Sequence, residues 1–376
     1  MSDVSNRRSV LVATGLAAVG TMTLGSDVTS PGDASHLHDA CSAALDAAVG
    51  AYETTELRAT AATLAPLEHA TRSVPRDHRL RGQVALDWMR LHAAVTTAAA
   101  AVSYDRGRHA DAAARADRAA SLARAAGDGP LAARALALRA RMVRPHSPAV
   151  SLQIAGVAAR IAGFSPTRAL IAGKVVTSAC AATGDTAGVR DAVARAWQTM
   201  ERLDDVDFGT PGFALETYSP ADLALACAEA LTTVGAADEA TPHLERAETL
   251  VVGSGQTGMV VSVRMARARA ALAREIPDRD EAATFAGQAV ALSAARPAEW
   301  LARLVRDVSQ LSEQRTGYGL DDLVDATAPW LHSTIETDGG ADAVSAVARV
   351  GLTAPSGVMV QRAGGPPTVP APRPAR

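Results

Sequence analysis

The feature that most constrains the fold of this chain is a helix–turn–helix register that recurs along it. Its clearest copy is an apolar helical run over 223–231, a turn at Gly235, and a second helix with apolar residues at Ala240, Leu244 and Ala247. Glycine supplies the left-handed conformation that ends many helices, and small residues at steps of three and four let two helices pack closely. The same register recurs with turns near Gly107, Gly184 and Pro277.

The expected fold class is therefore all-α, an array of stacked helical hairpins. One hairpin buries only part of its apolar face, so neighbouring units must stack into a continuous α-solenoid. Runs of β-branched residues are short, so no strand pattern competes. The chain is 48% hydrophobic but only 3% aromatic, which is typical of closely approaching helices rather than of a sandwich or barrel core.

The register resembles the tetratricopeptide repeat, in which helix A, a glycine-centred turn and helix B form one unit. Segments such as TGDTAGVRDAVARAWQTM and FGTPGFALETYSPADLALACAEALTTVGAADEATPHLERA are similar to the repeat half of actinobacterial Xre-type transcriptional regulators, over roughly residues 36–315. In that family a helix-turn-helix domain precedes the repeats, whereas here the Asn6-Arg7-Arg8 segment starts almost at Met1. The resemblance therefore implies a helical binding domain, without direct nucleic-acid binding.

Charge and cysteine content limit the partners and the cellular compartment expected for the chain. A net charge of −3 is too small to indicate nucleic acid or an anionic membrane as an obligatory partner. Three scattered cysteines provide neither a disulfide framework nor a zinc spacing and favour a reducing compartment. Cys180 and Cys227 occupy positions where the repeat needs small residues, so they are expected to be buried. Packing positions are also expected for Trp197, Trp300 and Trp330.

Three regions are expected along the chain. Residues 1–34 form a leader, 35–340 the tetratricopeptide-like repeat domain, and 355–376 a disordered proline-rich tail. Arg7-Arg8 and the apolar run to Leu24 resemble a twin-arginine export signal. The run is too short for a membrane span and lacks an A-x-A cleavage site. We expect a cytoplasmic protein, with export by the twin-arginine route as the alternative.

Proline and glycine clusters mark the expected breaks between helices. In several of them serine directly precedes proline, which is typical of a helix N-cap followed by proline at the first helical position. The breaks are expected at 72–75, 127–130, 145–148, 165–166, 219–220 and 296–297.

The sequence contains no motif that indicates a particular reaction. The chain has no P-loop, no H-E-x-x-H, no G-x-S-x-G and no C-x-x-C. One G-x-G-x-x-G occurs over 253–258 without the strand that a dinucleotide site requires, so we interpret it as a turn between helices. In the polar cluster from Asp33 to Cys41, His36 and His38 would point about 200° apart on a helix, which argues against a shared metal ion. No cofactor and no metal is expected.

The strongest binding candidates are residues expected on the inner face of the array, which helix A lines. Arg264, Arg267 and Arg274 fall on one helical face at spacings of three and seven. Guanidinium groups bind carboxylates through paired hydrogen bonds, so this stripe predicts a carboxylate or an acidic peptide segment as partner. The alternative is a solvated face with internal pairs, for example to Glu275 or Asp278. The other groove candidates are Lys174, Ser178, Asp222, Glu229 and Tyr104.

Three functions follow as hypotheses. The first is a non-catalytic binding module that holds a peptide or protein partner in its groove, in a regulatory or accessory scaffold role. The second is a sensor for a small molecule or signalling peptide, which the resemblance to regulators implies. The third is an enzyme that recruited the scaffold, with a cluster of perturbed pKa values around Tyr104, Lys174, His92 or the arginines. A homodimer is left open.

Overall fold

The computed structural model describes residues 31–294 and 298–332 of the 376-residue chain. Most of the expected leader, the tail over 355–376 and the expected break at 296–297 lie outside these ranges. Every regular element within them is a helix, and none is a strand. The predicted all-α fold class is therefore confirmed.

The helices follow one another along the described chain with short connections. None of them combines the length and the apolarity that a membrane span requires. The α-helices are α2 (Pro31–Gly50), α3 (Leu57–Asp77), α4 (Gly82–Asp105), α5 (His109–Ala125), α6 (Gly129–Val143), α7 (Pro148–Ile161), α8 (Pro166–Leu170), α9 (Thr177–Ala182), α10 (Thr186–Met200), α11 (Pro220–Thr233), α12 (Ala237–Val251), α13 (Thr257–Ala273), α14 (Arg279–Ser293), α15 (Glu299–Thr316) and α16 (Asp321–Thr327). The remaining helical pieces are the π-helical η1 (Ile171–Val176) and the 3₁₀ segments η2 (Asp205–Asp207) and η3 (Ala328–His332).

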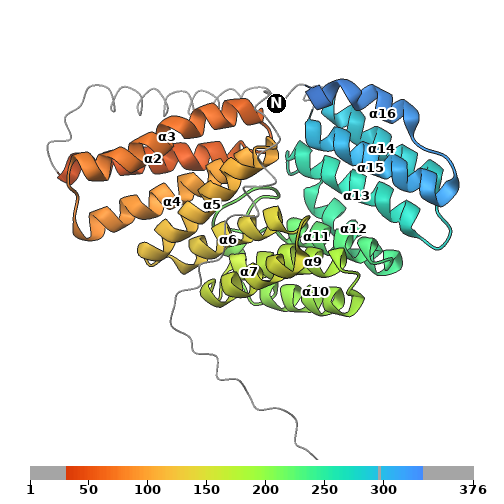
Figure 1. Ribbon diagram of the computed structural model, residues 1–376, viewed down its shortest axis with the longest axis horizontal. Coiled ribbons are helices and arrows are strands. Elements are labelled where there is room, and N and C mark those ends of the chain that lie inside the picture. Colours follow the sequence, from red (N-terminus) through yellow and green to blue (C-terminus); the bar gives the residue numbers. More distant parts are fainter. Residues whose placement is uncertain (1–30, 295–297, 333–376) are drawn as a thin grey trace, which may run out of the picture.

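Consecutive helices form hairpins, and the hairpins stack. The pairs are α2–α3, α4–α5, α6–α7, α8/η1/α9–α10, α11–α12, α13–α14 and α15–α16. The first helices of neighbouring hairpins also touch, from α4 through α6, η1, α11 and α13 to α15. Figure 1 shows the result as an arc, with α2–α5 at one end and α13–α16 at the other. This arrangement is consistent with the predicted solenoid.

The predicted glycine turns occur where the register places them. Gly107, Gly184 and Gly235 follow α4, α9 and α11 with φ values of 76°, 71° and 79°. A side chain would strain the backbone in this left-handed region, so glycine ends each helix at the lowest cost. The G-x-G-x-x-G over 253–258 likewise forms the turn between α12 and α13, which confirms its interpretation as a turn.

Two Ser-Pro breaks also occur as predicted. Pro148 and Pro220 begin α7 and α11, and the preceding hydroxyl groups of Ser147 and Ser219 accept hydrogen bonds from first-turn N–H groups. The break predicted at 72–75 is wrong, because α3 continues to Asp77. Val74 is 6% exposed in the core, so tertiary packing keeps this turn helical despite the proline that follows it.

A close helix–helix approach supports the inner wall of the arc. The helices α8, η1 and α9 run without interruption, with η1 as a π-helical section in the middle. A Cβ atom on Gly173 would lie 2.1 Å from Leu223 Cδ1 of α11, so only glycine allows this contact. Lys174 is the next residue along η1.

The connection between α10 and α11, residues 201–219, departs from the hairpin pattern. It is the longest connection in the described part of the chain and contains η2. Figure 1 shows it on the inner side of the arc, close to α11 and to the end formed by α4 and α5. We call residues 209–218 the crossing segment, because they reach the connection between α2 and α3.

Candidate functional site

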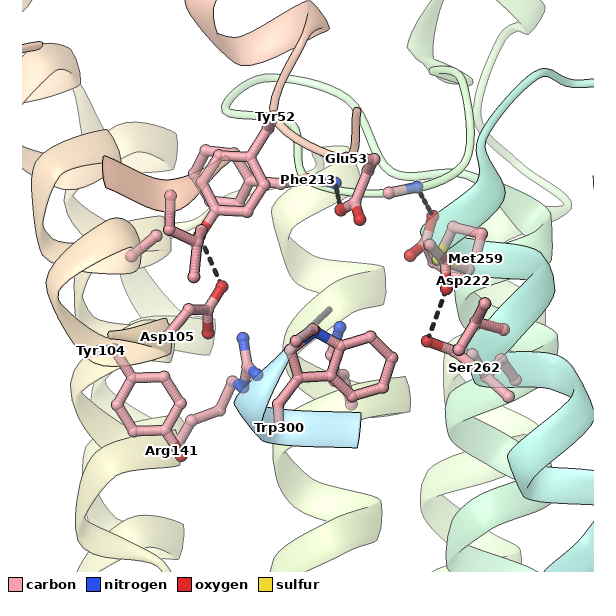
Figure 2. Close-up of a pocket in the computed structure, with 18 of the residues that line it drawn as sticks. Tyr52, Glu53, Tyr104, Asp105, Arg141, Phe213, Asp222, Met259, Ser262 and Trp300 are labelled. Carbon is pink, nitrogen blue, oxygen red and sulfur yellow. Dashed lines mark hydrogen bonds between the residues drawn. The ribbon is translucent and has the colours of Figure 1, made fainter. Parts of the chain in front are cut away.

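A cavity of about 670 Å³ lies inside the arc (Figure 2). Its walls come from α4, α6, η1, α11, α13 and α15, the first helices of successive hairpins. The connection between α2 and α3 and the crossing segment provide the rest of its lining. Residues from both ends of the arc therefore line one cavity.

Aromatic side chains line part of this cavity. Tyr104 extends from α4, and Figure 2 shows Trp300 reaching from α15 toward the middle of the cavity. The expectation that Trp300 packs between the last helices is wrong, since 38% of the residue is exposed. Its neighbour Leu301 is fully buried and takes the packing position. By contrast, Trp330 packs against the core of the last helices, as expected.

Two carboxylates hold the crossing segment over the cavity. Glu53 Oε1 accepts a hydrogen bond from the Phe213 N–H at 3.0 Å, and Asp222 Oδ2 accepts one from the Gly212 N–H at 2.9 Å. The ring centroids of Tyr52 and Phe213 are 4.7 Å apart. Gly212 has φ 114°, and a Cβ atom there would lie 2.6 Å from Glu53 Cγ. The glycine therefore permits the contact that closes this side of the cavity.

Three cationic side chains line the cavity from α6 and η1: Arg134, Arg141 and Lys174. Arg134 is only 6% exposed and donates a hydrogen bond to the carbonyl of Ala214 in the crossing segment. The Arg141 guanidinium lies 5.6 Å from the centre of the Tyr104 ring. Within residues 31–294 and 298–332, none of the three cations forms an ion pair with a carboxylate.

Burial shifts the pKa values of Lys174, Arg134 and Asp222 toward their neutral forms. Desolvation lowers the pKa of Lys174, and the charge of Arg141 lowers it further, while Asp222 opposes the shift. Burial also lowers the pKa of Arg134 to about 10. The pKa of Asp222 is raised by burial, which Lys174 partly offsets. Each shift means that the charged form reduces the stability of the fold unless a further counter-charge is present.

Several donors of the cluster also lack acceptors. Arg134 Nη1 and the Tyr218 hydroxyl are buried and have no hydrogen-bond partner among the described residues. Tyr218 is 3% exposed, and burial raises its pKa well above the usual value, so its hydroxyl stays protonated. The Lys174 ammonium forms no hydrogen bond with any described side chain. Unpaired buried donors are uncommon, because each forfeits the hydrogen bonds that water would give it.

Acidic groups are part of the same lining. Asp105 accepts a hydrogen bond from the Tyr52 hydroxyl at 2.5 Å, and Glu229 lines the cavity from α11 as an exposed residue. Glu53 also lines it, and burial raises the pKa of its carboxyl. The cavity therefore presents a cationic cluster together with separate carboxylates.

The structure brings together only part of the predicted groove set. Lys174, Glu229, Tyr104 and Asp222 all line the cavity. Ser178 is not part of the lining, and its hydroxyl donates instead to carbonyl groups of its own helix. None of the three predicted arginines lines the cavity.

The predicted inner position of these arginines is wrong. Arg264 and Arg267 both pair with Glu248 of α12, and both guanidinium groups lie 5.6 Å from the Phe285 ring centre on α14. They therefore lie on the side of α13 that packs against the second helices of hairpins. Ser262 lines the cavity, and Arg264 lies about 200° farther around the helix, so the expected register was rotated.

The third arginine of the predicted stripe also differs in position. Arg274 caps the end of α13 and pairs with Glu281 at the start of α14. Its side chain is 38% exposed and that of Glu281 is 30% exposed. The internal pairing that was weighed as the alternative thus occurs, but with Glu281 and Glu248 instead of Glu275.

Sequence reasoning missed most of the cationic cluster. Arg134 and Arg141 lie on α6, for which no inner face was predicted, and Tyr218 lies in the crossing segment, which is not helical. One signal was available in the sequence. Lys174 is the only lysine among the 37 Lys and Arg residues of the chain, and this single amine lies in the cavity.

The cysteines do not contribute to the site. Cys180 and Cys227 are buried in the core, as predicted, and Cys41 is fully buried as well. Burial raises the pKa of Cys41 to about 11 and that of Cys227 to about 12, so both thiols stay protonated at neutral pH. No grouping of His, Cys, Asp and Glu able to hold a metal ion occurs in the described ranges.

Comparisons with known proteins add no assignment to this geometry. No protein-family model matches the chain, and a search of the curated proteins returns no match. The interpretation of the cavity therefore depends on its own residues, their burial and their hydrogen bonds.

Proposed function

We propose that this protein is a non-catalytic binding module that encloses a ligand in the cavity of its arc. The observation that carries this proposal is the cavity of about 670 Å³, lined from both ends of the arc and covered by the crossing segment. Its volume lies within the range of about 300–1,000 Å³ typical of sites for small ligands. A small molecule or a peptide segment of a few residues fits such a space, whereas a folded partner does not.

The resemblance to the repeat half of Xre-type regulators supports a sensor or accessory role for this module. A ligand that contacts both ends of the arc would favour one distance between those ends. A partner protein would then bind the outer surface of the arc in this ligand-bound conformation. We propose a cytoplasmic location, supported by the buried free cysteines. Sequencing the N-terminus of the native protein distinguishes this location from export, because an exported protein would have lost its first residues.

Thermal unfolding of the full chain tests the proposed enclosure. A library of small organic acids, amino acids and short peptides should contain compounds that raise the midpoint of unfolding, because a ligand stabilises the state that binds it. Trp300→Ala removes one wall of the cavity and should abolish this rise. Tyr318→Ala is the matched control, since Tyr318 is 70% exposed and lies outside the lining. A library without any stabilising compound would contradict the proposal.

One observation favours a second candidate, an enzyme built on this scaffold. Lys174 has a lowered pKa and lies near Asp222, whose pKa is raised, and such pairs occur at sites with amine nucleophiles. The Lys174 amine would attack a carbonyl carbon, and loss of water would leave an imine. Pyruvate with borohydride tests this, because reduction of an imine adds a stable mass to Lys174. An unmodified Lys174 would exclude imine chemistry with this probe.

A further inference from the structure

The cationic cluster has more hydrogen-bond donors than the described residues satisfy. We propose that Arg134, Arg141, Lys174 and Tyr218 form an anion subsite that binds the carboxylate of a small organic acid. This inference depends on the proposed function, because it names the ligand class for the same cavity.

The cluster contains hydrogen-bond donors without partners among the described residues. Arg134 Nη1 and the Tyr218 hydroxyl are buried without a partner among the described residues, and Lys174 forms no ion pair. All three side chains line one cavity. A carboxylate has two oxygens with about four acceptor positions, so one such group can satisfy donors of all three residues.

The three cations of the cluster carry charges of the same sign and repel one another. In addition to burial, the charge of Arg141 lowers the pKa values of both Arg134 and Lys174, so the three cations lie close together. Asp222 and Glu229 oppose this effect at Lys174, and Asp222 already accepts a hydrogen bond from the Gly212 N–H of the crossing segment. A bound anion would reduce the mutual repulsion of the three cations.

The other residues that line the cavity favour a carboxylate over a phosphate. Asp105, Glu229 and Glu53 line the same cavity and would repel a doubly charged phosphate more strongly than a carboxylate with one charge. Trp300 and Met259 add apolar surface that a bare inorganic ion would leave uncovered. The geometry points to a carboxylic acid with an apolar or aromatic body.

The experiment measures binding of matched probes to the full chain by calorimetry. The probes are 3-phenylpropionate, its uncharged amide, inorganic phosphate, and N-acetyl-glycyl-phenylalanine with a free carboxyl end. The acid or the peptide should bind at least tenfold more tightly than the amide, because only a carboxylate accepts charge-assisted hydrogen bonds from the cluster. The peptide distinguishes a carboxylate at a chain end from that of a free acid, and binding of either supports the subsite.

Variants assign the effect to the cluster. Lys174→Gln and Arg141→Gln should each weaken acid binding at least tenfold and leave amide binding unchanged. Arg264→Gln is the matched control, because Arg264 pairs with Glu248 outside the cavity, and it should bind the acid as the wild type does. The sole lysine adds an independent readout: the acid should slow the modification of Lys174 by an amine-selective reagent, and the amide should not.

The outcomes separate this inference from the proposed function. Equal affinity for acid and amide in the wild type would overturn the anion subsite while the enclosed cavity stands, and this comparison needs no variant. Phosphate binding more tightly than the acid would overturn the assignment to a carboxylate. If none of the probes binds, the inference is overturned, and the thermal screen with Trp300→Ala decides independently whether the cavity encloses another ligand.

Discussion

Two groups of basic residues in this protein have opposite surroundings. On the outer side of α13, Arg264 and Arg267 share the carboxylate of Glu248, with nitrogen–oxygen distances of 2.5 Å each. Inside the arc, Lys174 and Arg141 line the cavity without an ion pair among the described residues. The outer charges have partners within the fold, and the inner charges lack them.

This difference shows that pairing, more than the number of charges, distinguishes a binding site from a structural surface. An arginine with its carboxylate contributes to packing between helices and has little capacity left for a ligand. A buried cation without a partner reduces stability, so its presence in a fold indicates a counter-ion from outside. Substitutions in the two groups test this difference, from the largest expected effect to the smallest.

Removing the shared carboxylate of the outer group should have the largest effect on stability. Glu248→Ala leaves two partly buried guanidinium groups without a counter-charge, and we expect the free energy of unfolding to fall by about 2 kcal/mol. Urea titration followed by circular dichroism measures this change. The control is Glu245→Ala, because Glu245 is exposed on the same helix and forms no ion pair with another described residue. Equal losses in both variants would show that the ion pairs of Glu248 contribute no more than an exposed glutamate on the same helix.

Removing the inner lysine should change stability in the opposite direction. Lys174→Met eliminates a desolvated charge, and we expect the free energy of unfolding of the ligand-free protein to rise by about 1 kcal/mol. Lys174→Arg retains the charge and should give no gain. A loss of stability in Lys174→Met, measured by the same urea titration, would mean that the attraction between Lys174 and Asp222 outweighs desolvation.

The pH dependence of this gain has a definite sign. The folded state lowers the pKa of Lys174 below its ordinary value of 10.5, so the folded protein binds fewer protons than the unfolded chain in the interval between these values. The cost of the charge is present in full below the lowered pKa and disappears as the pH rises toward 10.5. The stability difference between Lys174→Met and wild type should therefore shrink at alkaline pH.

Asp222 should modulate the inner group by a smaller amount. In Asp222→Asn the side-chain oxygen can still accept the Gly212 N–H, but the negative charge that competes with a ligand carboxylate is gone. We expect 3-phenylpropionate to bind about threefold more tightly, a change of about 0.6 kcal/mol. Calorimetric titration beside the wild type measures it. Weaker binding would indicate that the charge of Asp222 is needed to position the crossing segment.

The arrangement of helices could be predicted from the sequence because local signals determine it. Gly107, Gly184 and Gly235 are required wherever a helix ends in the left-handed conformation, and this requirement is visible without a structure. Alanines at steps of three and four, such as Ala240 and Ala247, are fully buried between helices as the spacing predicts. The prediction of a break at 72–75 was wrong, because the packing of Val74 in the core outweighs the local effect of Pro75.

The site could not be predicted to the same degree, because it depends on helix rotation and on a segment without a repeat pattern. A first helix of this array touches neighbours on several sides, so more than one of its stripes is enclosed. The predicted stripe on α13 does not face the cavity. Ser262 lines the cavity, and Arg264 points about 200° away from it around the helix axis. The crossing segment has no periodicity, yet its contact with Glu53 covers the cavity.

The smallest effect is expected for a pair with good geometry on an exposed surface. Arg190 of α10 donates three hydrogen bonds to Glu239 of α12, at 2.6, 3.0 and 3.2 Å. These bonds raise the pKa of Arg190 and lower that of Glu239, but the side chains are 56% and 46% exposed. Water solvates both ions almost equally well when they separate, and salt screens their attraction.

Arg190→Gln should therefore leave the urea midpoint unchanged within error, in contrast to Glu248→Ala. The Arg190–Glu239 pair separates the effect of ion pairing from the effect of burial. It has an ion pair like that of Arg264 with Glu248, but its side chains are more exposed. A midpoint shift as large as that of Glu248→Ala would mean that pairing alone stabilises the array. No shift would mean that this exposed ion pair contributes little to the stability of the array, as the solvation of both side chains predicts.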